Sequence, residues 1–171
     1  VYVVGGLRGG QVVTDVSAYD PLDDSWSELL APVPEGRDHL VGGFADGKLV
    51  AIGGRNVSIG AITGRVDLYD PGADEWSAGA EMLTPRAGCA AATVGDRIVV
   101  VGGEGASLPG GVFPEAEIYD AASDSWSPLP SMPVPRHGMG AAAVGAEVVV
   151  PGGADVQGFG AVDTVEILTV E

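Results

Sequence analysis

Short apolar runs alternate with glycine-rich turns along the whole chain. Four of these runs end in a pair of glycines, and one of them reads Arg97-Ile98-Val99-Val100-Val101-Gly102-Gly103. The other three runs lie at 1–6, 48–54 and 147–153. The glycine pairs begin at residues 5, 53, 102 and 152, so the spacing is 48, 49 and 50 residues. A constant period in this range indicates a repeat architecture, in which each repeat is one supersecondary unit.

Three further features recur between the glycine pairs. A Tyr-Asp pair occurs at 19–20, 69–70 and 119–120, and a tryptophan follows each tyrosine by seven residues: Trp26, Trp76 and Trp126. An arginine stands 16 residues before the first glycine of the next pair, at Arg37, Arg86 and Arg136. A run of small residues follows each arginine, as in 138–144. The spacing of these features predicts one local structure that is repeated along the chain.

Each repeat is predicted to contain four short strands, named a to d. Strand a is the small-residue run, and strand b is the β-branched run that ends in Gly-Gly. In strand c, successive residues alternate in character, as in 66–69 and 116–119, which places Val66 and Leu68 on one face of the sheet. Strand d starts at the tryptophan. Asp46-Gly47 and Gly95-Asp96 predict tight hairpins between a and b. The aspartates of 70–74 and its counterparts can cap the c–d turn by binding backbone N–H groups.

A four-stranded antiparallel meander at this period is a β-propeller blade, so the predicted fold class is all-β. Gly-Gly after an apolar strand, then Tyr-Asp, then Trp six residues after the Asp, resembles the kelch repeat over the whole chain. The predicted blades are 1–30 without strand a, 37–80, 86–130, and 136–171 without strand d. In the last blade Leu168 and Thr169 replace Tyr-Asp, no Trp follows, and Pro151 interrupts strand b. Kelch rings close with about six or seven blades, so we expect an incomplete ring with exposed apolar end faces, in a piece of a longer chain.

Composition narrows the classes of partner. The net charge of −16 repels phosphate backbones, so no nucleic-acid partner is expected. The acidity fits a halophilic source or lineage composition.

Cys89 is the single cysteine, in a run of small residues, and a small buried thiol without metal or disulfide is the favoured interpretation. No apolar run reaches the length of a membrane span.

Length variation between repeats is confined to one face. The Arg to Gly-Gly and Tyr to Trp distances are constant, whereas the b–c and d–a connections differ in length. Variation on a rigid scaffold is typical of a binding surface, so this loop face is the expected recognition surface. Solvated loop residues are the alternative interpretation of its side chains. The polar candidates are Arg55, Asn56, Arg65, Glu104 and Asp155, and the aromatic candidates are Phe113 and Phe159.

The repeated arginines and the histidines allow two interpretations. Arg37, Arg86 and Arg136 enter strand a near the loop face and could hold a carboxylate by bidentate bonds. In the kelch pattern, however, this arginine belongs to the repeat, which favours a scaffold role bonding carbonyls or carboxylates. His39 and His137 occupy nearly corresponding places in two blades, and His137 is a ligand-binding candidate beside Arg136. The Trp row is predicted to be core, because its spacing is locked to the tyrosines.

The resemblance implies a non-catalytic scaffold that presents its loop face to a protein or small ligand. The first alternative is a carbohydrate-active enzyme with a site in the central funnel, such as a sialic-acid mutarotase-like isomerase. A galactose-oxidase-like copper enzyme fits less well, since Cys89 lies in a strand and no tyrosine outside the strand-c positions is found except Tyr2. The second alternative is a structural module of a larger secreted or surface protein. No cofactor or metal is expected, and the ring is expected to close through further blades or by self-association.

Overall fold

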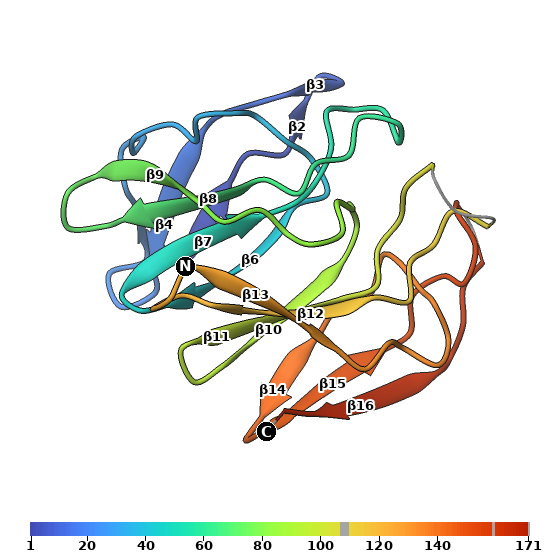
Figure 1. Ribbon diagram of the computed structural model, residues 1–171. Coiled ribbons are helices and arrows are strands. Elements are labelled where there is room, and N and C mark those ends of the chain that lie inside the picture. Colours follow the sequence, from blue (N-terminus) through green and yellow to red (C-terminus); the bar gives the residue numbers. More distant parts are fainter. Residues whose placement is uncertain (107–109, 159, 171) are drawn as a thin grey trace.

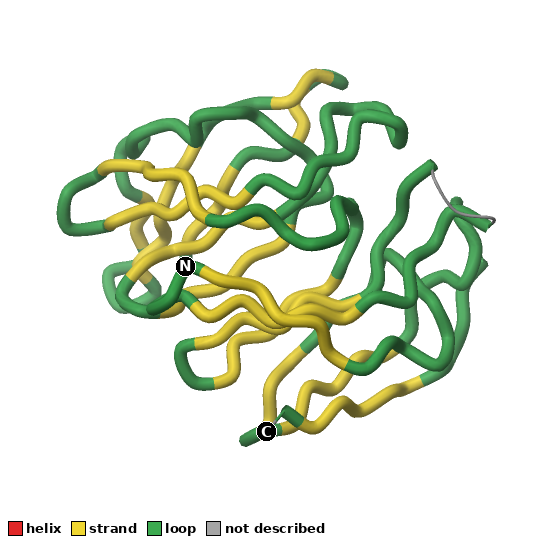
Figure 2. The backbone as a smooth tube through the Cα atoms, in the orientation of Figure 1, coloured by secondary structure: helices red, strands yellow, loops and turns green. Residues whose placement is uncertain are grey.

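The computed structural model describes residues 1–106, 110–158 and 160–170, and within them the chain forms sixteen β-strands and no helix. Four successive antiparallel sheets radiate from a shared inner edge like the blades of a fan (Figure 1). Glycine-rich loops and turns make up most of the remaining chain (Figure 2). The part of the chain that the structure describes has no helix that could cross a membrane.

The sheets are four blades in chain order. Blade 1 contains β1 (Tyr2–Val4), β4 (Val16–Asp20) and β5 (Ser25–Trp26). Blade 2 contains β6 (Val41–Ala45), β7 (Lys48–Ile52), β8 (Val66–Asp70) and β9 (Glu75–Gly79). Blade 3 contains β10 (Ala90–Val94), β11 (Arg97–Val101), β12 (Ala116–Asp120) and β13 (Ser125–Leu129). Blade 4 contains β14 (Ala142–Val144), β15 (Glu147–Pro151) and β16 (Val165–Thr169).

Every pairing within a blade is antiparallel and joins strands that follow one another in the blade. Blades 2 and 3 therefore have the predicted a-b-c-d meander, blade 1 has b-c-d, and blade 4 has a-b-c. The all-β incomplete-propeller prediction is confirmed. The sequence pattern did not predict the small hairpin of β2 (Leu7–Arg8) and β3 (Gln11–Val12), which lies inside the b–c connection of blade 1.

The core consists of apolar layers between neighbouring blades. Alternation along β11 divides its side chains between two layers, because successive residues point to opposite faces of a sheet. Ile98 and Val100 join the layer shared with blade 2, whereas Val99 and Val101 join the layer shared with blade 4. Strand β11 is buried on both faces and accordingly reads as a continuous apolar run.

The glycine pairs tie one blade to the next. In the first three pairs, the second glycine donates its N–H to the carbonyl of the repeated arginine in the following blade: Gly6 to Arg37 (2.8 Å), Gly54 to Arg86 (3.1 Å) and Gly103 to Arg136 (2.8 Å). The first glycine has a left-handed backbone, with φ of 60° at Gly53 and 61° at Gly102. Glycine suits this position because other residues adopt such a backbone only with strain.

The repeated arginines lie inside the blades. Arg37, Arg86 and Arg136 are 1%, 0% and 0% exposed. Each forms an ion pair with a strand-c carboxylate of its own blade, at 2.7 Å to Asp67, 2.6 Å to Glu117 and 2.7 Å to Glu166. Each also donates to a strand-b carbonyl, such as that of Ala51, Val100 or Val150. These bonds favour the scaffold interpretation of the three arginines.

Both end faces of the blade array are open. Val1 and Val3 on blade 1 are 74% and 49% exposed, and Val165 and Ile167 on blade 4 are 59% and 60% exposed. The predicted exposure of apolar end faces is therefore confirmed. The prediction that the Trp row is core is wrong for Trp26, which is 59% exposed because no described residue covers that side of blade 1. Trp76 and Trp126 are half-buried between blades.

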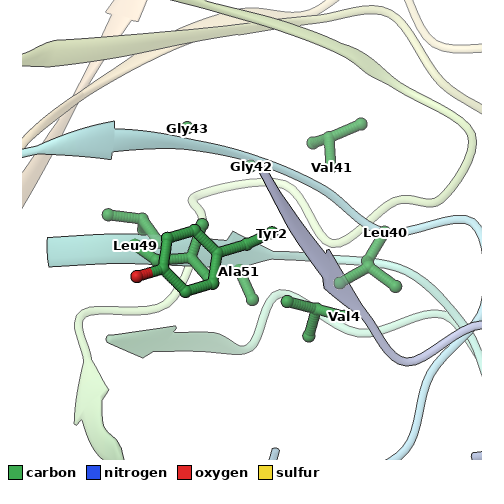
Figure 3. A pocket seen from close by; sticks show the side chains of 9 residues that line it. Tyr2, Val4, Leu40, Val41, Gly42, Gly43, Leu49 and Ala51 are labelled. Atoms are coloured by element: carbon green, nitrogen blue, oxygen red, sulfur yellow. The ribbon is translucent and has the colours of Figure 1, made fainter. Parts of the chain in front are cut away.

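The inner edge of blade 1 is open as well. Strand β1 pairs only with β4, so its second edge has no partner among the described strands. A cavity of about 280 Å³ lies beside this edge. Figure 3 shows Tyr2 and Val4 of β1 at the cavity, next to Leu49 and Ala51 of β7 and Leu40 before β6.

Cys89 is buried between the blades, as predicted. Burial raises the pKa of its thiol to about 11, and the nearby Arg86 only partly offsets this effect. The thiolate is therefore a minor species at neutral pH. This environment is that of a structural cysteine and not of a nucleophile.

Candidate binding site on the loop face

The loop face is formed by the b–c and d–a connections, which lie at the same end of every blade. There, the residue after each repeated arginine pairs with the residue after the glycine pair of the same blade. The three pairs are Asp38 with Arg55, Ala87 with Glu104, and His137 with Ala154. Backbone bonds at fixed positions thus present side chains that differ from one blade to the next.

A row of backbone bonds runs from blade to blade just beyond these pairs. Gly88 donates its N–H to the carbonyl of His39 (2.9 Å), and Gly138 donates to the carbonyl of Gly88 (2.9 Å). All three residues have left-handed backbones, with φ of 54° at His39, 61° at Gly88 and 65° at Gly138. A histidine therefore stands where the next two blades use glycine. Such local strain in a non-glycine residue is concentrated at functional sites in proteins.

Five side chains meet across blades 2, 3 and 4, and we call them the charged network: Asp38, His39, Arg55, Glu104 and His137. Arg55 is its centre. The guanidinium donates from Nε to Asp38 Oδ1 (2.9 Å) and from Nη1 to Glu104 Oε1 (2.8 Å). Its Nη2 lies 3.1 Å from His39 Nε2. One side chain thereby connects a carboxylate of its own blade with a carboxylate of the next.

The partners of His39 define its tautomer. Arg55 can only donate, so Nε2 of His39 accepts, and Nδ1–H is left to donate to Asp38 Oδ1. Asp38 also accepts the N–H of Val57 at Oδ2 (2.8 Å). Val57 has φ of 60°, which is strained for a β-branched residue. The bond to Asp38 helps to hold this strained loop in place.

Glu104 and His137 extend the network into blade 4. Glu104 Oε2 lies 3.6 Å from His137 Nδ1, while His137 Nε2–H donates to the carbonyl of Val156 (3.0 Å). His137 also lines an open cavity of about 380 Å³. The other lining residues are small: Gly138, Gly153, Ala154, Gly158, Gly160 and Ala161.

The carboxylates of the network are less accessible than its bases. The side chains of Asp38 and Glu104 are 3% and 6% exposed, whereas those of Arg55 and His39 are 16% and 41% exposed. Burial pushes the pKa of Asp38 upward, but hydrogen bonds from Arg55, Val57 and His39 outweigh it and hold that pKa below its usual value. Asp38 is thus a carboxylate at neutral pH, and it holds Arg55 and His39 in place.

The remaining sequence candidates lie outside the network. Arg65 forms a bidentate pair with buried Asp67, with Nη2 at 2.7 Å from Oδ1. Asn56 is exposed beside Arg55, and Asp155 is exposed near the cavity of blade 4. Phe113 is 4% exposed and packs inside its loop. Phe159 lies outside the described residues.

Two members of the network were not among the predicted site residues. Asp38 directly follows a repeated arginine and was not singled out, and His39 was noted only as one of two histidines. The signal that could have found them is the change from Asp38-His39 to Ala87-Gly88 and His137-Gly138 directly after the three arginines. Within the described residues, no group of three or more His, Cys, Asp or Glu side chains could hold a metal ion.

The blades and their inter-blade bonds define a β-propeller. The sequence matches the Kelch motif family over residues 1–29, 37–83 and 85–133, so the chain belongs to the Kelch family. Search of the curated proteins finds no match. Among solved structures, the chain is similar to that of YjhT, with a TM-score of 0.74 and 23% sequence identity. This similarity covers 89% of the chain and 55% of YjhT, so the chain spans about half the length of that protein.

Proposed function

We propose that this chain is a non-catalytic binding scaffold that presents its loop face to a protein or small ligand. The observation that carries the proposal is the charged network. Its members occupy corresponding positions in three blades, yet they differ in type, whereas the residues that hold the blades together repeat. Loop side chains that depart from the repeat, with His39 and part of Arg55 open to solvent, are typical of recognition and not of folding.

The pairing inside the network indicates which contacts a ligand can make. Arg55 already has a carboxylate on each side, so a purely anionic group would have to displace Asp38 or Glu104. A purely cationic group would compete with Arg55 for the same two carboxylates. A ligand that offers both donors and acceptors can instead bind His39 and the edge of Arg55 with the pairs intact. Peptide groups and sugar hydroxyls have this chemistry.

The variant Arg55→Gln tests the assignment of the network. The probes are galactose, N-acetylneuraminic acid, and one acidic and one basic capped hexapeptide, each titrated by calorimetry against the wild-type chain. For the probe that binds most tightly, we expect Arg55→Gln to weaken binding at least tenfold, since a buried hydrogen-bonded charge at an interface is worth about 2 kcal/mol or more.

The matched control is Arg8→Gln. Arg8 also lies in a b–c connection, but its ion-pair partner is Asp15, which is not a member of the network, and its side chain is 72% exposed. Its replacement is expected to change the affinity by less than about twofold. Equal affinities for the wild type and Arg55→Gln, with both proteins folded, would remove the network from the binding site. Absence of binding for all four probes would contradict the proposal for these ligand classes.

The Glu104–His137 pair favours a second candidate, a carbohydrate isomerase. His137 lines a cavity and Glu104 lies 3.6 Å from it, so an imidazole and a carboxylate that can exchange protons with a substrate lie near one another. If this candidate is correct, the chain accelerates interconversion of the anomers of N-acetylneuraminic acid, as followed by NMR. His137→Gln is then expected to reduce that rate about 100-fold, since positioned acids and bases contribute factors of this size. A rate equal to that of buffer alone would exclude this candidate for the chain.

A further inference from the structure

Neighbouring blades are also joined at their outer ends by a repeated pair of hydrogen bonds. Asp74 Oδ1 accepts the N–H of Ala31 (2.8 Å), and Trp76 Nε1 donates to the carbonyl of the same residue (2.8 Å). Asp124 and Trp126 hold Ala80 in the same way, at 2.7 and 2.8 Å. We call each Asp–Trp pair a clasp. Each clasp binds the backbone N–H and the backbone C=O of one residue in the preceding d–a connection.

A tyrosine holds each clasp in shape. The hydroxyl of Tyr69 donates to Asp74 (2.7 Å), and its ring packs against Trp76 with 5.1 Å between centroids. The same contacts hold the clasp of blade 3, where the hydroxyl of Tyr119 donates to Asp124 (2.6 Å). The clasp is therefore held in shape by contacts within its own blade.

Blade 1 has a clasp of the same shape. Tyr19 donates to Asp24 (2.7 Å) and packs against Trp26 with 5.2 Å between centroids. Asp24 has φ of 48°, close to the 54° of Asp74. Within the described residues, however, no backbone N–H donates to Asp24 and no carbonyl accepts from Trp26. An open cavity of about 400 Å³ includes Trp26, Tyr19 and Val1 in its lining.

The apolar surface beside this clasp is uncovered as well. Val1 pairs with Tyr19 as Ile98 pairs with Tyr119. Ile98 and its neighbour Val100 are fully buried in one cluster with Met82, which lies two residues after the gripped Ala80. Their counterparts in blade 1, Val1 and Val3, are exposed. A segment in the clasp could cover these valines with an apolar residue at the position of Met82.

We propose that Asp24 and Trp26 bind an extended peptide segment of the same kind as residues 79–85. The segment must offer both N–H and C=O at one small residue and an apolar side chain two positions later. Ala31 and Val33 fit this pattern in the first connection, as Ala80 and Met82 do in the second. The partner is recognised mainly through its backbone, and the site is distinct from the loop face.

A second copy of the chain does not supply this segment. Its connections at Ala31 and Ala80 are already held by its own clasps. In the third connection, Pro130 stands two residues before buried Met132, at the position of Ala31 and Ala80, and proline has no N–H to donate. Blade 4 correspondingly has Leu168 at the position of Tyr19, Tyr69 and Tyr119, so it lacks the hydroxyl that binds the clasp aspartate in the other blades. The third connection therefore cannot offer the N–H that a clasp binds.

The three tryptophans provide the test. Their indole N–H groups give three signals in a ¹⁵N–¹H NMR spectrum of the chain, assigned by single Trp→Phe variants. The probe is the capped heptapeptide Gly-Ala-Glu-Met-Leu-Thr-Pro, which has the sequence of residues 79–85. We expect the Trp26 signal to shift saturably with this peptide, while the signals of Trp76 and Trp126 remain in place because these groups are already bonded.

Two matched changes test the mechanism. The same peptide with proline in place of its alanine is expected to bind at least tenfold more weakly, because it lacks the gripped N–H. Trp26→Phe removes the indole donor at an exposed position and is expected to weaken binding about fivefold or more. No shift of Trp26, equal binding of both peptides, or equal shifts of all three indoles would overturn the proposal. A Trp26 shift that depends on protein concentration without peptide would assign the site to a second copy and overturn it too.

Discussion

Replacing Arg86 by methionine is expected to lower the free energy of unfolding by about 3–5 kcal/mol, the cost of breaking a buried ion pair from one side. Arg86 is fully buried, and its Nη1 lies 2.6 Å from Glu117 Oε1. Without the guanidinium, Glu117 is a buried carboxylate without its cationic partner, and the carbonyls of Thr84 and Val100 lose a donor. Urea denaturation of the wild type and the variant measures the difference.

The control for this prediction is Arg8→Met, which breaks a pair between exposed side chains and is expected to change stability by less than about 1 kcal/mol. The double variant Arg86→Met/Glu117→Leu removes the orphaned charge, so it should be more stable than Arg86→Met alone. A loss below about 1 kcal/mol for Arg86→Met would contradict the scaffold role of the repeated arginines.

Replacing Gly102 by alanine is expected to destabilise the chain by about 3 kcal/mol or more. The backbone at Gly102 has φ of 61°, and a Cβ there would lie 2.4 Å from the carbonyl oxygen of Arg136 and 2.4 Å from Met139 Cε. The methionine can move, but the carbonyl belongs to the backbone that joins blades 3 and 4. Backbone strain of about 1–2 kcal/mol therefore adds to the cost of overpacking.

Gly95→Ala separates these two contributions. Gly95 has nearly the same φ, 63°, but a Cβ there meets no atom within 4 Å. This variant should lose only the stability that corresponds to the backbone strain, about 1–2 kcal/mol. Thermal and urea unfolding of both variants give the comparison. If Gly102→Ala and Gly95→Ala lose equal stability, the glycine pair is needed for its backbone conformation alone and not for the close approach of two blades.

Much of the fold could be predicted from the sequence because its determinants are local. The apolar run before Gly102-Gly103 predicts strand β11, and Gly95-Asp96 predicts the turn that precedes it. The aspartates of the c–d turns cap backbone N–H groups as expected, for example Asp70 with Gly72 (2.8 Å). The hairpin of β2 and β3 was missed, since the short pieces around Gly9-Gly10 lack an alternating pattern.

The candidate site could be predicted only in part. The loop face and the positions of Arg55, Glu104 and His137 follow from comparing the repeats. The contacts among them do not, because Arg55 and Glu104 are 49 residues apart and meet only through the angle between two blades. The role of Asp38 was hidden for the same reason. Exposure of Trp26 likewise depends on what covers blade 1, which a repeat pattern does not reveal.

The central claim is that recognition occurs at the charged network of the loop face. The most direct measurement is an NMR map of the amide and side-chain signals of the wild-type chain during titration with the tightest of the four probes. We predict that the largest shifts fall on His39, Arg55 and His137 and on the loop at Val57. Shifts confined to the opposite end of the blades, in the c–d turns at 20–24, 70–74 and 120–124, would contradict the claim.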